Sequence, residues 1–228
     1  MSRHLHDLSA RPPFRRATVR LCSLVTPVDQ FSFFFAFYGL ILGLAVAELL
    51  GGFAGLVRAH ALKRLDAQTA LAALLTFVLI VATWVDTFSM DRGITLSFSD
   101  LWPPILLSTF YYLAAAVIFP RDPRQFPHLR AYWAARRKFI VGMLFAAELV
   151  DFYANRYWLA DRYHHAPASF WAWTVPYNVA IKGCFLALFL VRGRRATIVL
   201  LAVQILLFMI PYWHAGGVER LWLRALGY

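Results

Sequence analysis

Residues 31–57 read FSFFFAFYGLILGLAVAELLGGFAGLV, and Glu48 is the only charged residue in this stretch. An α-helix rises ~1.5 Å per residue and the hydrocarbon core of a bilayer is ~30 Å thick, so about 20 apolar residues are enough to cross it. Five more apolar runs follow, at 68–89, 101–119, 138–159, 170–191 and 196–213. The sequence therefore predicts an all-α polytopic membrane protein, a bundle of six transmembrane helices over residues 31–213.

The composition points to the same class. Hydrophobic residues make up 61% of the 228 residues and charged residues 15%, with a net charge of +11. A soluble domain carries ~25% charged residues. Lys and Arg gather in short stretches between the apolar runs, which is typical of loops that flank a membrane, so we expect the lipid bilayer as partner and no nucleic acid. We interpret residues 1–30 as a basic, poorly ordered arm, and 214–228 as a short tail that could lie in the membrane interface.

The basic residues are distributed unevenly between the loops. The loops after the first, third and fifth spans hold twelve, against three in the loops after the second and fourth spans. The twelve are Arg58, Lys63, Arg64, Arg121, Arg124, Arg130, Arg136, Arg137, Lys138, Arg192, Arg194 and Arg195, and the three are Arg92, Arg156 and Arg162. Basic loops stay in the cytoplasm, so we expect the odd-numbered loops there, in a multi-pass protein of the bacterial inner membrane. The basic 120–138 loop is expected to contact anionic lipid.

This orientation conflicts with the charge of the amino-terminal arm. An even number of spans with the first loop inside places both termini outside, yet the arm carries five arginines. They are Arg3, Arg11, Arg15, Arg16 and Arg20. The arm lacks the apolar core of a secretory signal peptide. Three explanations are open: the arm stays inside and the first span is not a simple crossing, the arm crosses despite its charge, or translation begins near Val25, which we favour.

Three of the predicted spans carry an ionisable side chain ten residues from the basic residue that marks the end of the span. The pairs are Glu48 and Arg58, Glu148 and Lys138, and Lys182 and Arg192. Ten residues correspond to about 15 Å along a helix, near the middle of the hydrocarbon core, where a charge is costly and therefore usually paired or functional. We predict that Lys182 lies within ~4 Å of the carboxylate of Glu148 or Glu48, which makes the first, fourth and fifth spans neighbours.

Other polar residues lie near this depth or one to two turns outward from it. Glu148, Asp151 and Asn155 share one face of the fourth span because of their spacing. The further candidates are Asn178 on the fifth span, Tyr112 on the third, Gln204 on the sixth and Asp86 at the outer end of the second. Together these side chains predict a polar layer near the middle of the membrane, with a track toward one surface along the second, fourth and fifth spans.

Small residues recur at every fourth position of the first span. They are Gly39, Gly43, Ala47, Gly51 and Gly55. A strip of this kind lets membrane helices approach one another closely. We therefore interpret it as a helix-packing face, either within the protomer or against a second copy in a homo-oligomer, and we favour packing within the protomer.

A short internal similarity links the first and fourth spans. Residues 45–49 read AVAEL and residues 146–150 read AAELV. Two spans that are three positions apart run in opposite directions, which is the arrangement of transporters built from inverted repeats. We treat a weak 3+3 inverted repeat as a hypothesis, because the other spans show no similarity of this kind.

Enzyme chemistry finds little support in the sequence. The seven histidines lie in the arm, in loops or at span ends, and the two cysteines form neither a disulfide nor a zinc pattern. We expect no catalytic residue, no metal site and no cofactor. The preferred function is a transporter or channel for protons, ions or a small solute that uses Glu48, Glu148 and Lys182. The alternative is a membrane scaffold or partner subunit whose buried charges serve helix assembly.

Overall fold

The computed structural model describes residues 30–88, 98–122, 126, 129–210 and 223–224, and in this part the regular structure is helical. The elements are α2 (Gln30–Arg58), η1 (Leu62–Arg64), α3 (Ala67–Phe88), α4 (Phe98–Ile118), α5 (Leu129–Ala154), α6 (Arg156–His165), α7 (Pro167–Ser169), η3 (Phe170–Thr174), α8 (Val175–Leu190) and α9 (Arg194–Met209). The predicted arm 1–30 and the tail 214–228 lie outside the described residues, apart from Gln30 and residues 223–224.

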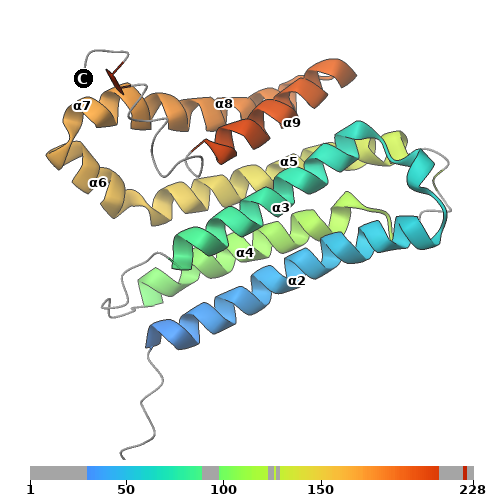
Figure 1. The fold of residues 1–228 in the computed structure, drawn as a ribbon, viewed down its shortest axis with the longest axis horizontal. Helices are drawn as coiled ribbons and strands as arrows, with labels where there is room; N and C mark the ends of the chain where they lie inside the picture. Colours follow the sequence, from blue (N-terminus) through green and yellow to red (C-terminus); the bar gives the residue numbers. More distant parts are fainter. Residues whose placement is uncertain (1–29, 89–97, 123–125, 127–128, 211–222, 225–228) are drawn as a thin grey trace, which may run out of the picture.

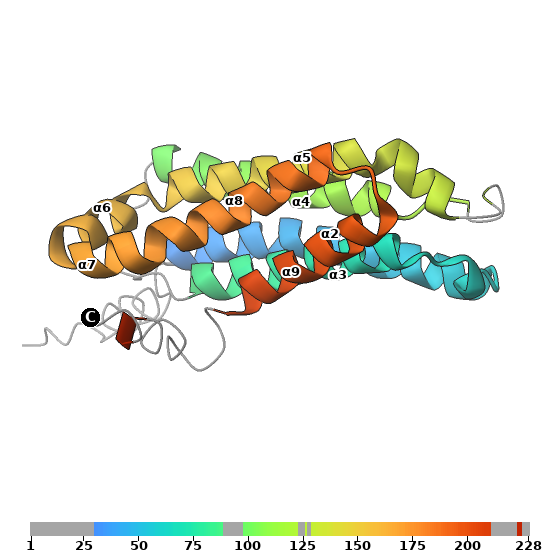
Figure 2. The same cartoon turned by 90° about the horizontal axis from the view of Figure 1, so that it is seen from above.

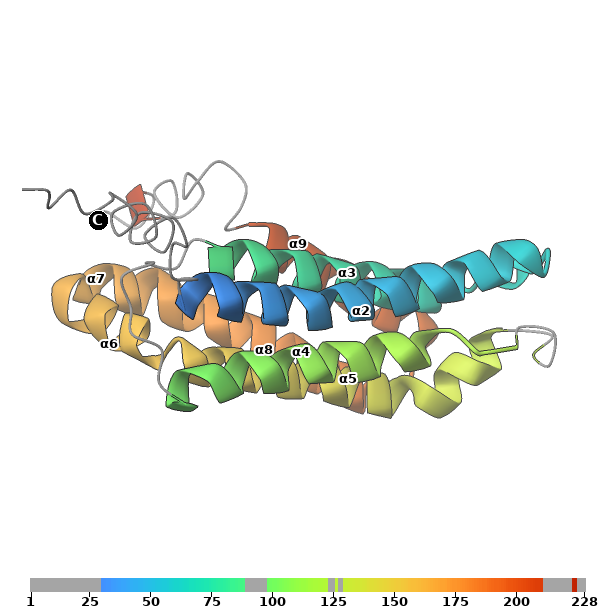
Figure 3. The same ribbon diagram turned by 90° about the horizontal axis from the view of Figure 1, so that it is seen from below.

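The long helices lie side by side as one elongated bundle (Figures 1 and 2). α4 packs against α2 and α5, α3 packs against α2 and α9, and α8 packs against α5 and α9. The connections that follow α2, α4 and α8 lie at the same end of the bundle (Figure 3). We call it the basic end, and it holds residues 58–66, 119–122 and 191–195. The loops that were predicted to share one membrane face therefore lie together.

Four helical segments are long and apolar enough to cross a membrane. They are Phe34–Arg58, Ala67–Thr87, Leu101–Ile118 and Pro167–Leu190. The outer surface of the bundle is also apolar: Leu40, Val179 and Leu206 are 63%, 64% and 63% exposed. A soluble monomer rarely exposes large contiguous apolar patches, whereas lipid tails accept them without cost. The described part of the chain is thus helical, with four segments that are long and apolar enough to span a membrane.

The amino-terminal part of α5 differs from the sequence prediction. The 120–138 loop was expected to lie partly along the membrane surface, with the fourth span beginning at residue 138. Instead α5 begins at Leu129 and continues without a break to Ala154. Trp133, which is only 2% exposed, anchors this first part of α5 in the core. Burial of one large aromatic side chain explains why the segment extends the bundle.

Prolines shape the beginnings of α4 and α8. The sequence indicated that Pro103 and Pro104 lie in the first turn of their helix. Because α4 begins at Phe98, both prolines lie inside the helix instead. Before α8, residues Phe170–Thr174 form a π turn. Pro176 lies two residues later and has no backbone N–H to continue an α-helical ladder, which the wider turn accommodates.

The small-residue strip of α2 packs within the protomer only at Gly39, where an added Cβ would lie 3.5 Å from Nε1 of Trp84 on α3, and the rest of the strip faces outward. No heavy atom would lie within 4 Å of a Cβ added at Gly43, Gly51 or Gly55. Ala47 is also exposed. The face of α2 that packs into the bundle instead carries larger side chains and one alanine. They are Phe34, Tyr38, Leu42, Ala45, Leu49 and Leu56.

The glycine that permits close helix contact is Gly52. A Cβ added there would lie 2.6 Å from Cδ2 of Phe119, at the end of the neighbouring α4. Phe119 is buried, so its ring has little room to move away. Sequence spacing singled out the neighbouring Gly51, which lies on the outward face.

The internal similarity between the first and fourth spans is not matched by similar burial. In α2, Glu48 is exposed while Leu49 is buried. In α5 the pattern is reversed, since Glu148 is buried and Leu149 is exposed. The two glutamates are therefore not equivalent in their surroundings.

The pair Gly51 and Gly52 offers a direct test of this packing. We expect Gly52→Ala to lower the free energy of unfolding by about 1–3 kcal/mol, because the added methyl group overpacks the contact with Phe119. Gly51→Ala is the matched control and should be neutral or stabilising by up to ~1 kcal/mol, since alanine is the better helix former. Thermal unfolding of the purified protein in detergent measures both. Equal midpoints for the two variants would contradict the assigned α2–α4 contact.

Candidate functional site

α5 positions two carboxylates on the side that faces the bundle. Glu148 is only 6% exposed and lies beside the fully packed Leu144 and Ala147. Asp151 follows by nearly one helical turn, so it points to the same side. Near the end of α5, the Nδ2 of Asn155 donates a hydrogen bond to the backbone carbonyl of Asp151 at 3.0 Å. Glu148 and Asp151 thus lie on one side of α5, and Asn155 follows the helix as an exposed residue.

α8 positions Lys182 next to α5. Its Nζ donates a hydrogen bond to Oδ1 of Asn178 at 2.8 Å. The Nδ2 of Asn178 in turn donates to the carbonyl of Thr174 at 3.0 Å. The same ammonium lies 4.4 Å from the ring centroid of Phe152, a cation–π contact between α8 and α5. Lys182 is therefore held in place without a carboxylate partner in direct contact.

The predicted salt bridge of Lys182 is not formed. Among the described residues, no carboxylate oxygen lies within ion-pair distance of its Nζ. Glu148 and Asp151 both interact with the ammonium through space instead. Asn178 takes the first contact because it stands four residues earlier on the same helix face, within easy reach of the long lysine side chain.

Glu48 does not belong to this cluster. It lies on the exposed face of α2, and α2 packs against α3 and α4. α3, α4 and α5 lie between α2 and α8 in Figure 1. The prediction that the first, fourth and fifth spans are mutual neighbours is thus wrong for the first. Asp151, and not Glu48, is the second carboxylate that interacts with Lys182.

Tyrosines on α4 and α8 interact with the carboxylates, and a tyrosine on α2, described below, does so as well. Tyr111 on α4 and Tyr177 on α8 both interact electrostatically with Glu148. The hydroxyl of Tyr111 lies 3.2 Å from Oγ1 of Thr83 on α3. The hydroxyl of Tyr177 donates to the carbonyl of Leu207 on α9 at 3.0 Å. Each hydroxyl is thereby tied to a neighbouring helix.

Sequence reasoning had selected Tyr112 in this layer. Tyr111 is the buried one, whereas Tyr112 is half-buried, because one residue turns the side chain by ~100° around the helix. Tyr38 on α2 was missed, although it interacts electrostatically with Asp151 and Asp86. Its position four residues after Phe34, on the apolar face of α2, was the available signal.

The remaining candidates lie at different distances from the cluster. Asp86, on an exposed turn near the end of α3, interacts with Asp151. Asn155 is exposed at the end of α5. Gln204 on α9 is completely buried, and its amide has no hydrogen-bond partner within the described part of the chain. Glu148, Asp151 and Asp86 thus outline a row of carboxylates from the interior toward the end of the bundle opposite the basic end.

The charges in this cluster do not balance locally. Two carboxylates on α5 act on one ammonium, and Glu148 is almost entirely removed from solvent. In a low-dielectric interior an excess of negative charge favours uptake of a proton or a cation. The described residues contain no group of three or more His, Cys, Asp or Glu side chains that could hold a metal ion. The arrangement therefore suits exchange of a proton or a weakly held cation.

Comparisons with known proteins give no indication of the function of this chain. No protein-family model, curated protein or solved structure matches this chain. The function is therefore inferred from the chemistry of the buried groups.

Proposed function

We propose that this chain is a six-span membrane protein that moves protons or a small cation through its interior by way of Glu148, Asp151 and Lys182. The observation that carries the proposal is the excess of carboxylate over ammonium in the buried cluster. A purely structural network inside a membrane would be less costly if it were neutral.

Six spans result from the four apolar segments together with α5 and α9. α5 turns Glu148 and Asp151 toward the bundle, and α9 is packed against both α3 and α8. The basic end gathers the arginine-rich connections, which favours placing that end in the cytoplasm of a bacterial cell. The row from Glu148 to Asp86 then leads from the membrane interior toward the opposite surface.

In this mechanism a carboxylate changes its protonation or cation occupancy while Lys182 stays charged. Lys182 lowers the cost of one ionised carboxylate, and the second one binds the transported proton or cation. Glu148 and Asp151 are nearly one helical turn apart, about 5 Å along the axis. A proton or ion can pass between groups at this spacing directly or through one water molecule.

The proposal is tested by flux through liposomes that contain the purified protein. An imposed potential should drive proton or cation movement, read with an internal pH-sensitive dye or a cation indicator. We expect Glu148→Gln and Asp151→Asn to reduce the rate at least ~10-fold, because each removes a group that binds the transported charge.

Glu48→Gln is the matched control, since it makes the same chemical change on the outward face of α2. It should retain the wild-type rate. Wild-type liposomes that remain tight to protons, Na⁺ and K⁺ would overturn the proposal, and so would equal losses in Glu48→Gln and Glu148→Gln.

A second candidate function is that of a subunit in a larger membrane assembly, with the interior charges serving helix assembly. The outward strip of α2 favours it, because Gly43, Ala47 and Gly51 leave space for a second helix to approach. Glu48 lies beside this strip and would otherwise face lipid, at a cost of ~2.5–3.5 kcal/mol on insertion scales. A symmetric pair of copies would bring two Glu48 carboxylates together, so a partner helix with a basic side chain suits the strip better.

Site-specific photocrosslinking in the native membrane distinguishes this candidate. A photoreactive residue in place of Ala47 should give a discrete protein adduct, because the strip contacts the partner. The same probe in place of Val179, on the exposed face of α8, is the control and should react with lipid only. An adduct of twice the protomer mass would identify a second copy as the partner, and absence of any protein adduct would exclude the assembly role of α2.

A further inference from the structure

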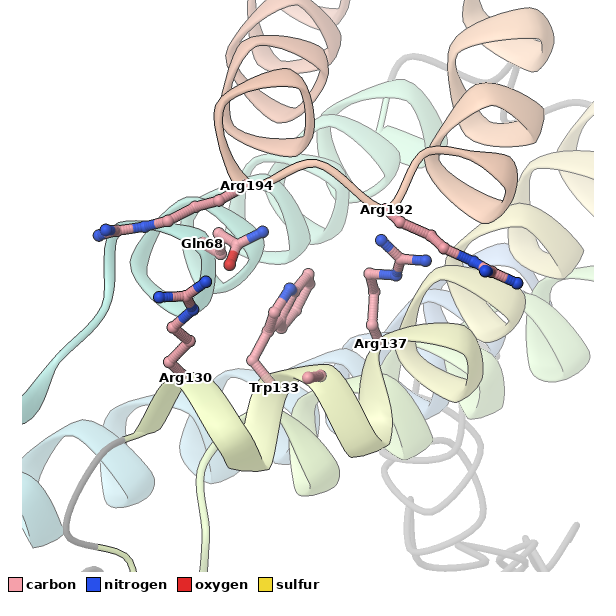
Figure 4. Close-up of a pocket in the computed structure, with 7 residues that line it drawn as sticks. Gln68, Arg130, Trp133, Arg137, Arg192 and Arg194 are labelled. Atoms are coloured by element: carbon pink, nitrogen blue, oxygen red, sulfur yellow. The ribbon is translucent and has the colours of Figure 1, made fainter.

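A pocket of about 270 Å³ opens at the basic end of the bundle (Figure 4). It lies between the first turns of α3 and α5 and the connection from α8 to α9. Its lining side chains include Gln68, Arg130, Trp133, Arg137, Arg192 and Arg194. None of these residues takes part in the carboxylate cluster described above.

Three contacts hold the walls of the pocket together. Arg194 forms an ion pair with Asp66, with 2.8 Å between Nη2 and Oδ1. The other oxygen of Asp66 accepts a hydrogen bond from the backbone N–H of Gln68 at 3.2 Å, which caps the start of α3. Arg137 donates a hydrogen bond to the backbone carbonyl of Val191, directly after α8. The pocket therefore has a defined frame made by α3, α5, α8 and α9.

The charge of this pocket is strongly positive. Four arginines line it, and Asp66 pairs with one of them. Arg130 and Arg192 form no ion pair with any residue that the structure describes. Like charges gathered around one cavity raise the local potential, and an anion in the cavity relieves their repulsion.

A buried hydrogen-bond donor adds a second, independent sign of a ligand. Trp133 is 2% exposed, and its Nε1 has no hydrogen-bond partner within the described residues. An indole N–H can only donate, and a buried donor without a partner is costly. Figure 4 shows Trp133 rising from α5 between Arg130 and Arg137, opposite Gln68. An oxyanion in the pocket would accept a hydrogen bond from the indole and lie beside Arg130, while the side chains of Arg192 and Arg194 extend to either side of the pocket.

The position along α5 indicates which oxyanion. Arg137 lies eleven residues before Glu148, which corresponds to about 16 Å along the helix axis, and Arg130 lies about 10 Å further out. With Glu148 near the middle of a ~30 Å hydrocarbon core, Arg137 is at its edge and Arg130 is in or just beyond the headgroup layer. This is the depth of lipid phosphate groups.

We propose that this pocket binds a phosphate ester, with the headgroup phosphate of an anionic phospholipid as its natural occupant. Basic pockets between membrane helices on the cytoplasmic side are suited to such headgroups. The volume lies just below the ~300–1,000 Å³ of typical small-molecule pockets, which fits a headgroup better than a bulky solute. This inference rests on the membrane placement of the proposed six-span protein, but it does not depend on transport of protons or cations.

The test measures binding to the purified full-length protein in a zwitterionic detergent. The probes are short-chain phosphatidylglycerol, glycerol 3-phosphate, inorganic phosphate and, as the neutral comparison, short-chain phosphatidylcholine. We expect phosphatidylglycerol to bind and to raise the thermal unfolding midpoint, and phosphatidylcholine to do neither. Binding of phosphatidylglycerol alone identifies a lipid headgroup, whereas binding of glycerol 3-phosphate or phosphate as well shows that the phosphate suffices.

Three variants assign the binding to this pocket. The double variant R130Q/R192Q removes the two arginines that form no ion pair with the described residues and should weaken binding at least ~10-fold. Trp133→Phe removes the N–H while keeping an aromatic ring and should weaken it by about 10-fold. The double variant K63Q/R64Q removes the same charge from the exposed η1 turn at the same end, and it should bind like the wild type.

The proposal is overturned if phosphatidylglycerol, glycerol 3-phosphate and inorganic phosphate all fail to bind, if R130Q/R192Q binds unchanged, or if K63Q/R64Q loses as much affinity as R130Q/R192Q. Circular dichroism and gel filtration establish that each variant is folded. If R130Q/R192Q does not fold, Trp133→Phe decides alone, and unchanged affinity in that variant overturns the proposal.

Discussion

Inside a hydrocarbon layer, a backbone amide needs an internal partner and a charged side chain needs a counter-charge, a polar neighbour or neutrality. The rest of this structure depends on that constraint. Backbone groups are paired within long helices, and many large apolar side chains are exposed on the outer surface of the bundle. Lys182 meets the constraint through the Asn178 amide and the Phe152 ring. Glu148 and Asp151 meet it less completely, and for this reason they are the residues on which the proposed function rests.

α5 connects the two sites that carry the proposals. Its first turns line the arginine pocket, and its last turns carry the two carboxylates. The helix therefore has excess positive charge at one end and excess negative charge in the membrane interior. Lysine and arginine side chains at the edge of a membrane contact lipid headgroups at little cost in free energy. Carboxylates in a membrane interior have no headgroups or water around them to stabilise their charge. Under the two proposals, the same helix has an anchoring role at the surface and a chemically active role at depth.

Much of the architecture could be predicted from composition and spacing. The apolar runs indicated the long helices to within a few residues, except where Trp133 extends α5 and where α4 begins before its prolines. The spacing of Glu148, Asp151 and Asn155 indicated a shared face, and Lys182 was expected beside that face. The arginine pocket was not foreseen as a pocket. It combines residues from α3, α5 and the α8–α9 connection, which are far apart in the sequence.

The sequence by itself determined how far along its helix each residue lies, because helix rise converts residue number into distance along the axis. By that measure Glu48 and Glu148 are alike. Only the tertiary structure decided which way each one faces, because rotation about the axis depends on which neighbouring helices supply matching surfaces. In α2 the face with the larger side chains packs into the bundle, and Glu48 and most of the small strip lie on the opposite, outward face. Gly52 contacts Phe119. A regular spacing identifies a helix face, and packing against other helices determines what that face contacts.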